Sequence, residues 1–198
     1  MQKSFVILIA GLMAAQFMGC EQKPSAASEP TIDLAARGKY LVSTSACHDC
    51  HSPKIIDHRG MPIPDTTRLL SGHPENEPYP TWAPADLQQR NILTATNPML
   101  TAWAGPWGVS FTANLTPDTS TGIAEWTEET FMAAIRTGKH QGQPNGRDIL
   151  PPMPWVVYRH ATDEDLKAIW AYLRSIPPIK NPVPLPIPPG SSTTGSNE

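Results

Sequence analysis

The sequence lacks three features that would each define a large class of proteins. It has no excess of positive charge, because 15 basic residues face 18 acidic ones and the formal net charge is −3. Nucleic acid is therefore not an expected partner. The apolar run from Phe5 to Ala15 is shorter than the roughly 20 residues that a transmembrane helix needs. Cysteine is also scarce, with three residues in 198, and two of them share one short stretch.

That stretch is CHDCH, residues 47–51. Two cysteines three apart and followed directly by a histidine form the pattern for covalent c-type haem attachment. Positions three and four apart share one face of a helical turn, so Cys47 and Cys50 can reach the two vinyl groups of one porphyrin. His51 then points at the iron from the same side. The motif predicts one covalent haem c with Cys47 and Cys50 as thioether ligands and His51 as an axial iron ligand.

Three other interpretations of the cysteine pair are weaker. A thioredoxin-like pair would need a βαβ setting, which the sequence does not show. A disulfide between Cys47 and Cys50 does not fit easily within a helical turn. A zinc site needs two more ligands, which His58 or His73 could supply. A haem also suits the 23 prolines, because a chain with long irregular segments gains an apolar surface from a buried cofactor.

The first 32 residues predict export and attachment to a membrane. Residues 1–20 have a basic residue near their start, Lys3, followed by an apolar run, as a signal peptide does. They end in Phe17-Met18-Gly19-Cys20, which is similar to a bacterial lipobox and makes Cys20 the expected lipidation site; ordinary cleavage nearby is the alternative. Residues 21–32 are small, polar and proline-containing, so we expect a flexible tether. The expected location is the periplasmic side of a bacterial membrane.

Hydrophobic periodicity predicts three helices around the motif. The first starts at Asp33, has the spacing Leu34, Gly38, Leu41, Val42 and continues through Ser45-Ala46 into the haem motif. The second is capped by Thr127, has Trp126 and Phe131 as a hydrophobic staple and ends at Gly138. The third has a capping-box-like start at Thr162 and Asp165, an apolar stripe, and a stop at two prolines; the stripe is Leu166, Ile169, Trp170 and Leu173.

The remaining segments are predicted to be irregular. Residues 52–107 show no sustained periodicity apart from a possible short helix from Pro84 to Leu93. Their tryptophans, Trp82, Trp103 and Trp107, argue against disorder, so we expect a loop that wraps one side of the haem; a partner-binding surface is the alternative. Residues 111–115 predict a short extended piece before a turn at NLTPD. Residues 139–161 are irregular, and residues 181–198 predict a Pro-rich disordered tail.

The sixth iron ligand is predicted to be Met153. It stands between Pro152 and Pro154, and prolines on both sides stiffen the loop that would present its thioether. The alternatives are His140 and His160. If Met153 does not bind, an open sixth position would make the protein a haem-based gas sensor or haem enzyme instead.

These features together resemble the class I cytochrome c family. Residues 109–180 are similar to haem modules of cytochrome c subunits of bacterial membrane-associated dehydrogenases, through NLTPD, Trp126, FMAAIR, PPMPW and DLKAIWAYLRSIPP. The resemblance implies an all-α fold with few helices around one covalent haem and long Pro-rich loops. It also implies that the first and last helices cross closely, which would place Gly38 against the Trp170 face. Those subunits usually carry several haems, whereas this sequence has one C-x-x-C-H.

We therefore expect a cytochrome c domain over residues 33–180. Its predicted function is to carry single electrons between periplasmic or membrane redox partners, with a dehydrogenase as a candidate donor. The chain is then an electron-transfer protein, not an enzyme. Its expected partners are a redox protein donor and acceptor, and the membrane through lipidated Cys20.

Overall fold

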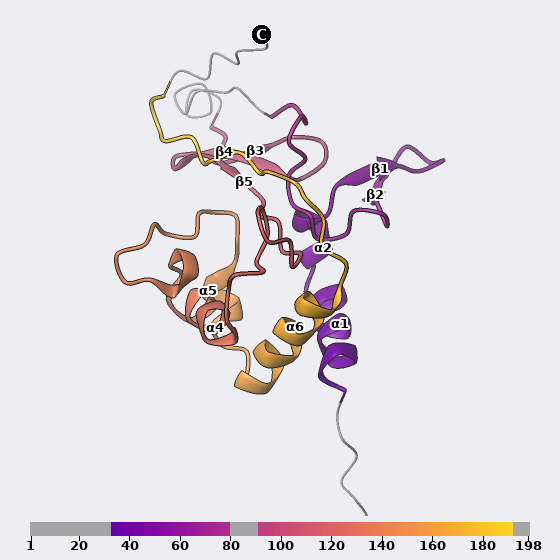
Figure 1. Ribbon diagram of the computed structural model, residues 1–198. Coiled ribbons are helices and arrows are strands. Elements are labelled where there is room, and N and C mark those ends of the chain that lie inside the picture. The colour runs from indigo at the N-terminus through magenta and orange to yellow at the C-terminus, as the bar shows by residue number, and fades with distance from the viewer. Residues whose placement is uncertain (1–32, 80–90, 192–198) are drawn as a thin grey trace, which may run out of the picture. The chain divides into compact units, whose positions relative to one another are not determined.

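A computed structural model of the chain describes residues 33–79 and 91–191 (Figure 1). The predicted signal peptide, tether and Cys20 lie outside the described residues, as does most of the possible helix from Pro84 to Leu93. The described helices are α1 (Leu34–Thr44), α2 (Cys47–His51), α4 (Glu128–Thr137), α5 (Trp155–Tyr158), α6 (Asp163–Ser175) and the 3-10 turn η1 (His140–Gly142). None of these helices is long and apolar enough to cross a membrane.

Helices α1 and α6 lie side by side and form the most extensive helix–helix contact among the described elements (Figure 1). Gly38 makes this possible, because a Cβ at that position would lie 1.9 Å from the carbonyl oxygen of Ala168. The close crossing that the sequence predicted is therefore present. Its detail differs, since Gly38 faces Ala168 and Tyr172 instead of Trp170. Only a residue without a side chain lets the two backbones approach this closely.

Capping residues fix the ends of the three longer helices. Asp33 and Thr127 accept hydrogen bonds from Ala36 N and Thr130 N, so α1 and α4 begin where the sequence predicted. Gly138 ends α4 with a φ of 71°. Thr162 likewise caps α6 by accepting from Asp165 N, at 3.1 Å.

The predicted capping box at α6 forms only in half. The Asp165 carboxylate does not return to the cap, because Arg37 of α1 donates to it through Nε at 3.1 Å and Nη2 at 3.0 Å. This ion pair joins the two helices at their partly exposed edge, where such pairs contribute little to stability. It links a residue near the start of α1 to one near the start of α6.

Two small antiparallel sheets occupy the segment predicted to be a loop. Strands β1 (Lys54–Ile56) and β2 (Pro62–Pro64) form a hairpin, and β3 (Ala95–Thr96), β4 (Ala102–Gly105) and β5 (Gly108–Phe111) form a three-stranded sheet. The prediction that residues 52–107 lack regular structure was wrong there, because strands of two to four residues are too short to show an alternating pattern. The helices of the predicted fold are present, but an all-α description does not cover these sheets.

The main hydrophobic core joins the helices. It consists of eight buried side chains, which are Val42, Leu70, Ile123, Phe131, Ile135, Leu166, Trp170 and Leu173. Phe131 and Trp170 stack with ring centroids 5.6 Å apart, which joins α4 to α6. A smaller cluster of Ala95, Ala104 and Val109 lies in the three-stranded sheet. The first core is the one that contacts the candidate site.

The described part of the predicted tail, residues 181–191, packs against the domain. Ile187 pairs with Val109 of β5 through two backbone hydrogen bonds of 2.8 and 2.9 Å. Asn181 donates from its side chain to the carbonyl oxygens of Ser71 and His73. This part of the Pro-rich segment therefore forms an additional edge of the sheet, whereas the sequence predicted disorder from residue 181 onward.

Candidate haem site

The CHDCH stretch forms a helical turn of its own, α2. The prediction that α1 continues into it was wrong, because Ala46 has a φ of 58° and breaks the helix between Ser45 and Cys47. Ser52 then takes an extended conformation and ends α2 after one turn. The break lets α2 leave the direction of α1 while Cys47, Cys50 and His51 stay on one short helix.

Both cysteines of α2 are free and half-buried. Burial is the main cause that raises the pKa of Cys47 to about 11, and it also raises the pKa of Cys50. A reactive dithiol has the opposite property, because its nucleophile needs a lowered pKa. The environment of the pair therefore argues against a thioredoxin-like function.

His51 is held with one ring nitrogen occupied. Its Nδ1 lies 2.8 Å from the carbonyl oxygen of Ala113. A carbonyl can only accept, so Nδ1 carries the proton and donates it. Burial lowers the pKa of His51 and keeps the ring neutral. Nε2 is then unprotonated, and it makes no hydrogen bond to the described residues. Its lone pair is therefore free, as an iron ligand requires.

Met153 packs against the same main hydrophobic core as Cys47. It is half-buried. Its loop is tied down on the N-terminal side, where Ser110 Oγ of β5 donates to the carbonyl oxygen of Pro151 at 2.5 Å. On the C-terminal side of Met153, Tyr158 Oη of α5 donates to the carbonyl oxygen of Ser45 at 2.5 Å. The sequence did not reveal these anchors, because Ser110 and Tyr158 stand in no recognisable motif.

Arg136 of α4 fixes the segment that follows α5. Its guanidinium donates to the carbonyl oxygens of Arg159 and Ala161, the latter at 2.8 Å, and pairs with Asp163. Charge-assisted hydrogen bonds of this kind are stronger than neutral ones. The loop that carries Met153 is thus held from α1, α4 and β5.

Of the other histidines, His48 belongs to α2 and its Nδ1 lies 2.9 Å from Ser52 Oγ, whereas the remaining four are not gathered around that helix. His73 is fully buried and its Nδ1 lies 3.0 Å from Thr101 Oγ1, while His58 is exposed near the hairpin. His140 packs edge-on against Trp126, and His160 is exposed. Within residues 33–79 and 91–191, no three His, Cys, Asp or Glu side chains come together as a metal site. The structure therefore brings neither candidate zinc ligand to Cys47 and Cys50.

Two asparagines lock the NLTPD turn to the end of α6. Asn114 accepts from Thr116 N and Oγ1, and donates to Thr121 Oγ1 and to the carbonyl oxygen of Ile179 at 2.8 Å. Asn181 donates from its backbone N to Thr121 Oγ1. This network supports the segment whose neighbour, Ala113, holds His51. The sequence predicted the turn but not the network.

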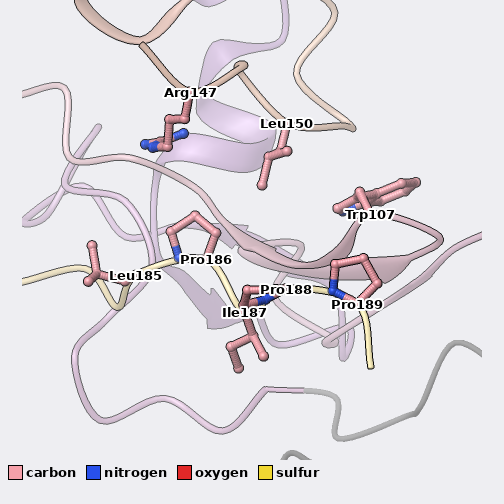
Figure 2. Close-up of a pocket in the computed structure, with 8 residues that line it drawn as sticks. All are labelled: Trp107, Arg147, Leu150, Leu185, Pro186, Ile187, Pro188 and Pro189. Atoms are coloured by element: carbon pink, nitrogen blue, oxygen red, sulfur yellow. The ribbon is translucent and has the colours of Figure 1, made fainter. Parts of the chain in front are cut away.

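A pocket of about 450 Å³ opens beside the loop that leads to Met153 (Figure 2). Arg147 and Leu150 line it on one side, Trp107 on another, and residues 185–189 form the opposite wall. Trp103 and Trp107 are half-buried, and their indole N–H groups donate to Leu100 O and Ser110 Oγ. Trp82, which the sequence also predicted to be buried, lies outside the described residues.

Comparison with known proteins identifies relatives of this chain. The chain is 27% identical over 180 residues to the gluconate 2-dehydrogenase cytochrome c subunit of Pantoea cypripedii, covering 90% of this chain and 30% of that protein. It is 28% identical over 187 residues to the fructose dehydrogenase cytochrome subunit of Gluconobacter japonicus, covering 92% and 29%. No family model matches the chain.

A third relative is the cytochrome c subunit of the quinone alcohol dehydrogenase of Gluconobacter oxydans, 31% identical over 146 residues, covering 73% of this chain and 27% of that protein. The chain therefore spans about 30% of the length of these relatives. This similarity confirms the prediction of a cytochrome c module that resembles those of dehydrogenase cytochrome subunits.

Proposed function

We propose that this protein is a monohaem cytochrome c that carries single electrons and catalyses no reaction itself. Cys47 and Cys50 would hold the haem through thioether bonds, and His51 and Met153 would bind the iron. The observation that carries the proposal is the hydrogen bond from His51 Nδ1 to Ala113, which leaves Nε2 as a neutral donor atom on the same turn as two free cysteines. The relatives support the same function, because they are named as cytochrome subunits of dehydrogenases.

The haem would supply the one-electron couple, and the residues of this chain would control it. Two covalent bonds keep the cofactor in place while its charge changes. The Ala113 carbonyl fixes the orientation of the His51 ring. The anchored loop presents the Met153 thioether, a ligand that raises the reduction potential. The Cys47 and Met153 side chains pack on the main core, which shields them in part from water, and residues 52–107 would cover one side of the haem.

The proposed partners are a redox protein donor, of the dehydrogenase type that the relatives' names describe, and a redox protein acceptor. The proposed location is the periplasmic side of a bacterial membrane. Residues 1–20 would serve as the signal peptide, Cys20 as the lipid anchor, residues 21–32 as the tether and residues 33–180 as the cytochrome domain. A Cys20→Ser variant tests the anchor: it should leave the membrane fraction and lack the mass of the acyl chains, and unchanged fractionation would contradict lipidation.

Haem attachment is tested by expressing the full chain with a c-type maturation system and measuring its mass under denaturing conditions. The wild-type mass should include one haem. Cys47→Ser and Cys50→Ser should each weaken attachment, and the double variant should carry no haem that survives denaturation. A wild-type protein without bound haem, or a double variant that retains it covalently, would overturn the proposed function.

A further inference from the structure

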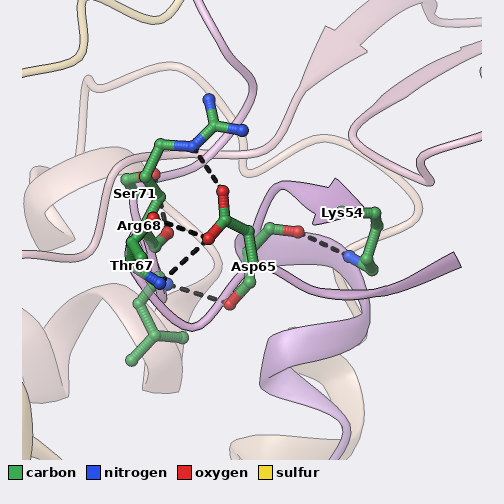
Figure 3. Close-up of polar contacts among 7 residues, drawn as sticks. Lys54, Asp65, Thr67, Arg68 and Ser71 are labelled. Carbon is green, nitrogen blue, oxygen red and sulfur yellow. Dashed lines mark hydrogen bonds and ion pairs between the residues drawn. The ribbon is translucent and has the colours of Figure 1, made fainter. Parts of the chain in front are cut away.

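Lys54 is a buried lysine whose amine points back at the end of α2. The residue is 8% exposed. Its Nζ lies 3.1 Å from the carbonyl oxygen of His48, 2.8 Å from that of Asp49 and 2.5 Å from that of Ser52. Figure 3 shows Lys54 with one of its hydrogen bonds. Three acceptors require three donors, and only the protonated ammonium has three. The geometry therefore defines Lys54 as a buried cation.

The chain around α2 explains why these carbonyls need a donor. The last carbonyls of a helix have no partner within the helix. The residue four positions after Asp49 is Pro53, which has no N–H to donate. The carbonyl of His48 receives only a long bond of 3.3 Å from Ser52 N, while that of His51 is satisfied by Gly72 N at 2.8 Å. Lys54 supplies the missing donors from outside the helix, at the negative end of its dipole.

The position of Lys54 is itself fixed by the hairpin. Lys54 is the first residue of β1, and its Cα partner in β2 is Pro64. Asp65 N donates to the carbonyl oxygen of Pro53 at 2.8 Å. The Asp65 carboxylate is occupied by Thr67 and by Arg68 Nε at 2.8 Å (Figure 3), so it does not turn toward the lysine. Lys54 forms no salt bridge within the described residues, and the one acidic side chain of α2, Asp49, is exposed.

We propose that Lys54 is a positioning residue for the haem motif, and that its buried positive charge raises the reduction potential of the haem. This inference rests on the proposed function. The ammonium holds the turn that carries Cys47, Cys50 and His51 in shape. Because ferric haem has one more positive charge than ferrous haem, a nearby buried cation favours the ferrous state. Such a charge is screened by salt much less than an exposed one.

The test is a spectroscopic redox titration of the mature holoprotein and of Lys54→Met. The variant should shift the ferrous-to-ferric equilibrium toward ferric haem by about tenfold, which is 59 mV for one electron. The shift should persist in 0.5 M salt, since the charge is buried. Lys39→Met removes an exposed lysine of α1 and should leave the potential unchanged. A simple structural loosening would instead allow the reduced variant to bind CO, which Lys54→Met should not do.

Two results separate the inference from the proposed function. A wild-type protein with no haem would overturn the proposed function, whatever Lys54 does. A wild type with haem, together with a Lys54→Met potential equal to that of wild type, would overturn the inference alone. If Lys54→Met accumulates no holoprotein, Lys54→Gln takes its place, because its neutral amide still has two donors. A Lys54→Gln potential equal to that of wild type would likewise overturn the proposal.

Discussion

The hydroxyl of Tyr158 donates a hydrogen bond to the carbonyl oxygen of Ser45, 2.5 Å away and 113 residues earlier in the chain. Ser45 precedes the cysteine pair by two residues, and Tyr158 follows Met153 by five. The bond thus connects the two segments that would supply the opposite iron ligands. It does so through a half-buried side chain whose pKa is raised mainly by burial.

Removing this hydroxyl should loosen the loop that carries Met153. Tyr158→Phe keeps the ring but leaves the Ser45 carbonyl without its donor, so we expect a loss of about 1 kcal/mol in the free energy of unfolding. The reduced variant should also bind CO faster than wild type. Tyr40→Phe changes an exposed tyrosine (60% exposed) and serves as control. Equal stability and equal CO binding in both variants would contradict the role assigned to Tyr158.

The contact between α1 and α6 should not tolerate a methyl group at Gly38. In an exposed helical position, alanine is favoured over glycine by about 1 kcal/mol. At Gly38 the Cβ would meet the Ala168 backbone at 1.9 Å, so Gly38→Ala should instead destabilise by about 1–3 kcal/mol. Lys39→Ala and Lys39→Gly change the exposed neighbouring position, and comparing them gives the intrinsic difference in unfolding free energy between alanine and glycine in this helix. Chemical denaturation measures all three, and a Gly38→Ala variant more stable than wild type would refute this crossing.

Asn114 should be essential for the turn that supports His51. It is 4% exposed and makes four hydrogen bonds through its side chain. Asn114→Ala leaves buried partners unsatisfied and should cost about 2–3 kcal/mol in unfolding free energy. Asn114→Asp keeps the acceptor for Thr116 but loses the donor to Ile179, so it should also destabilise. The exposed Asn145→Ala is the matched control; a similar small effect at both asparagines would argue against the network.

His73 should make stability depend on pH. It is fully buried, its Nε2 has no hydrogen-bond partner among the described residues, and burial lowers its pKa from 6.5 to about 4. The unfolded chain therefore binds a proton more readily than the folded one. The stabilising effect of the neutral ring is complete above pH 6.5 and is lost as the pH falls toward 4. Over that window the loss attributable to His73 should reach about 3 kcal/mol.

The His73 prediction is checked by urea unfolding at several pH values between 4 and 7. His73→Asn lacks the titrating ring, so its stability should fall less steeply than that of wild type. His58→Asn, at an exposed histidine, should follow the wild-type slope. Parallel curves for wild type and His73→Asn would show that the buried ring does not titrate in this range.

Local signals in the sequence predicted the three longer helices and the residues of the candidate site, but not α5 or η1, which lie in a segment predicted to be irregular. Asp33, Thr127 and Gly138 act at helix ends within a few residues of their own position, so their roles could be predicted without a structure. The cysteine pair and His51 lie on one turn for the same reason. The iron ligands themselves remain a prediction that the spectrum must test.

The remaining features depend on contacts between residues that are far apart in the chain. The break at Ala46, the two small sheets and the packed segment 181–191 carry no periodic pattern. The Ala113 carbonyl reaches His51 across 62 residues, and it is a backbone atom that every residue type possesses. The sequence does not single out Lys54, because lysine is usually exposed. Its position three residues after His51 acquires a role only through the fold.

The measurement that tests the central claim most directly is the visible absorption spectrum of the mature protein, oxidised and reduced. Sharp bands in the reduced state, with the weak far-red band that reports sulfur bound to ferric haem, are expected for ligation by His51 and Met153. The far-red band should disappear in Met153→Ala while the haem remains attached. Haem bands without the far-red band in the wild type would contradict Met153 as a ligand, and a protein without haem bands would contradict the assignment of a cytochrome.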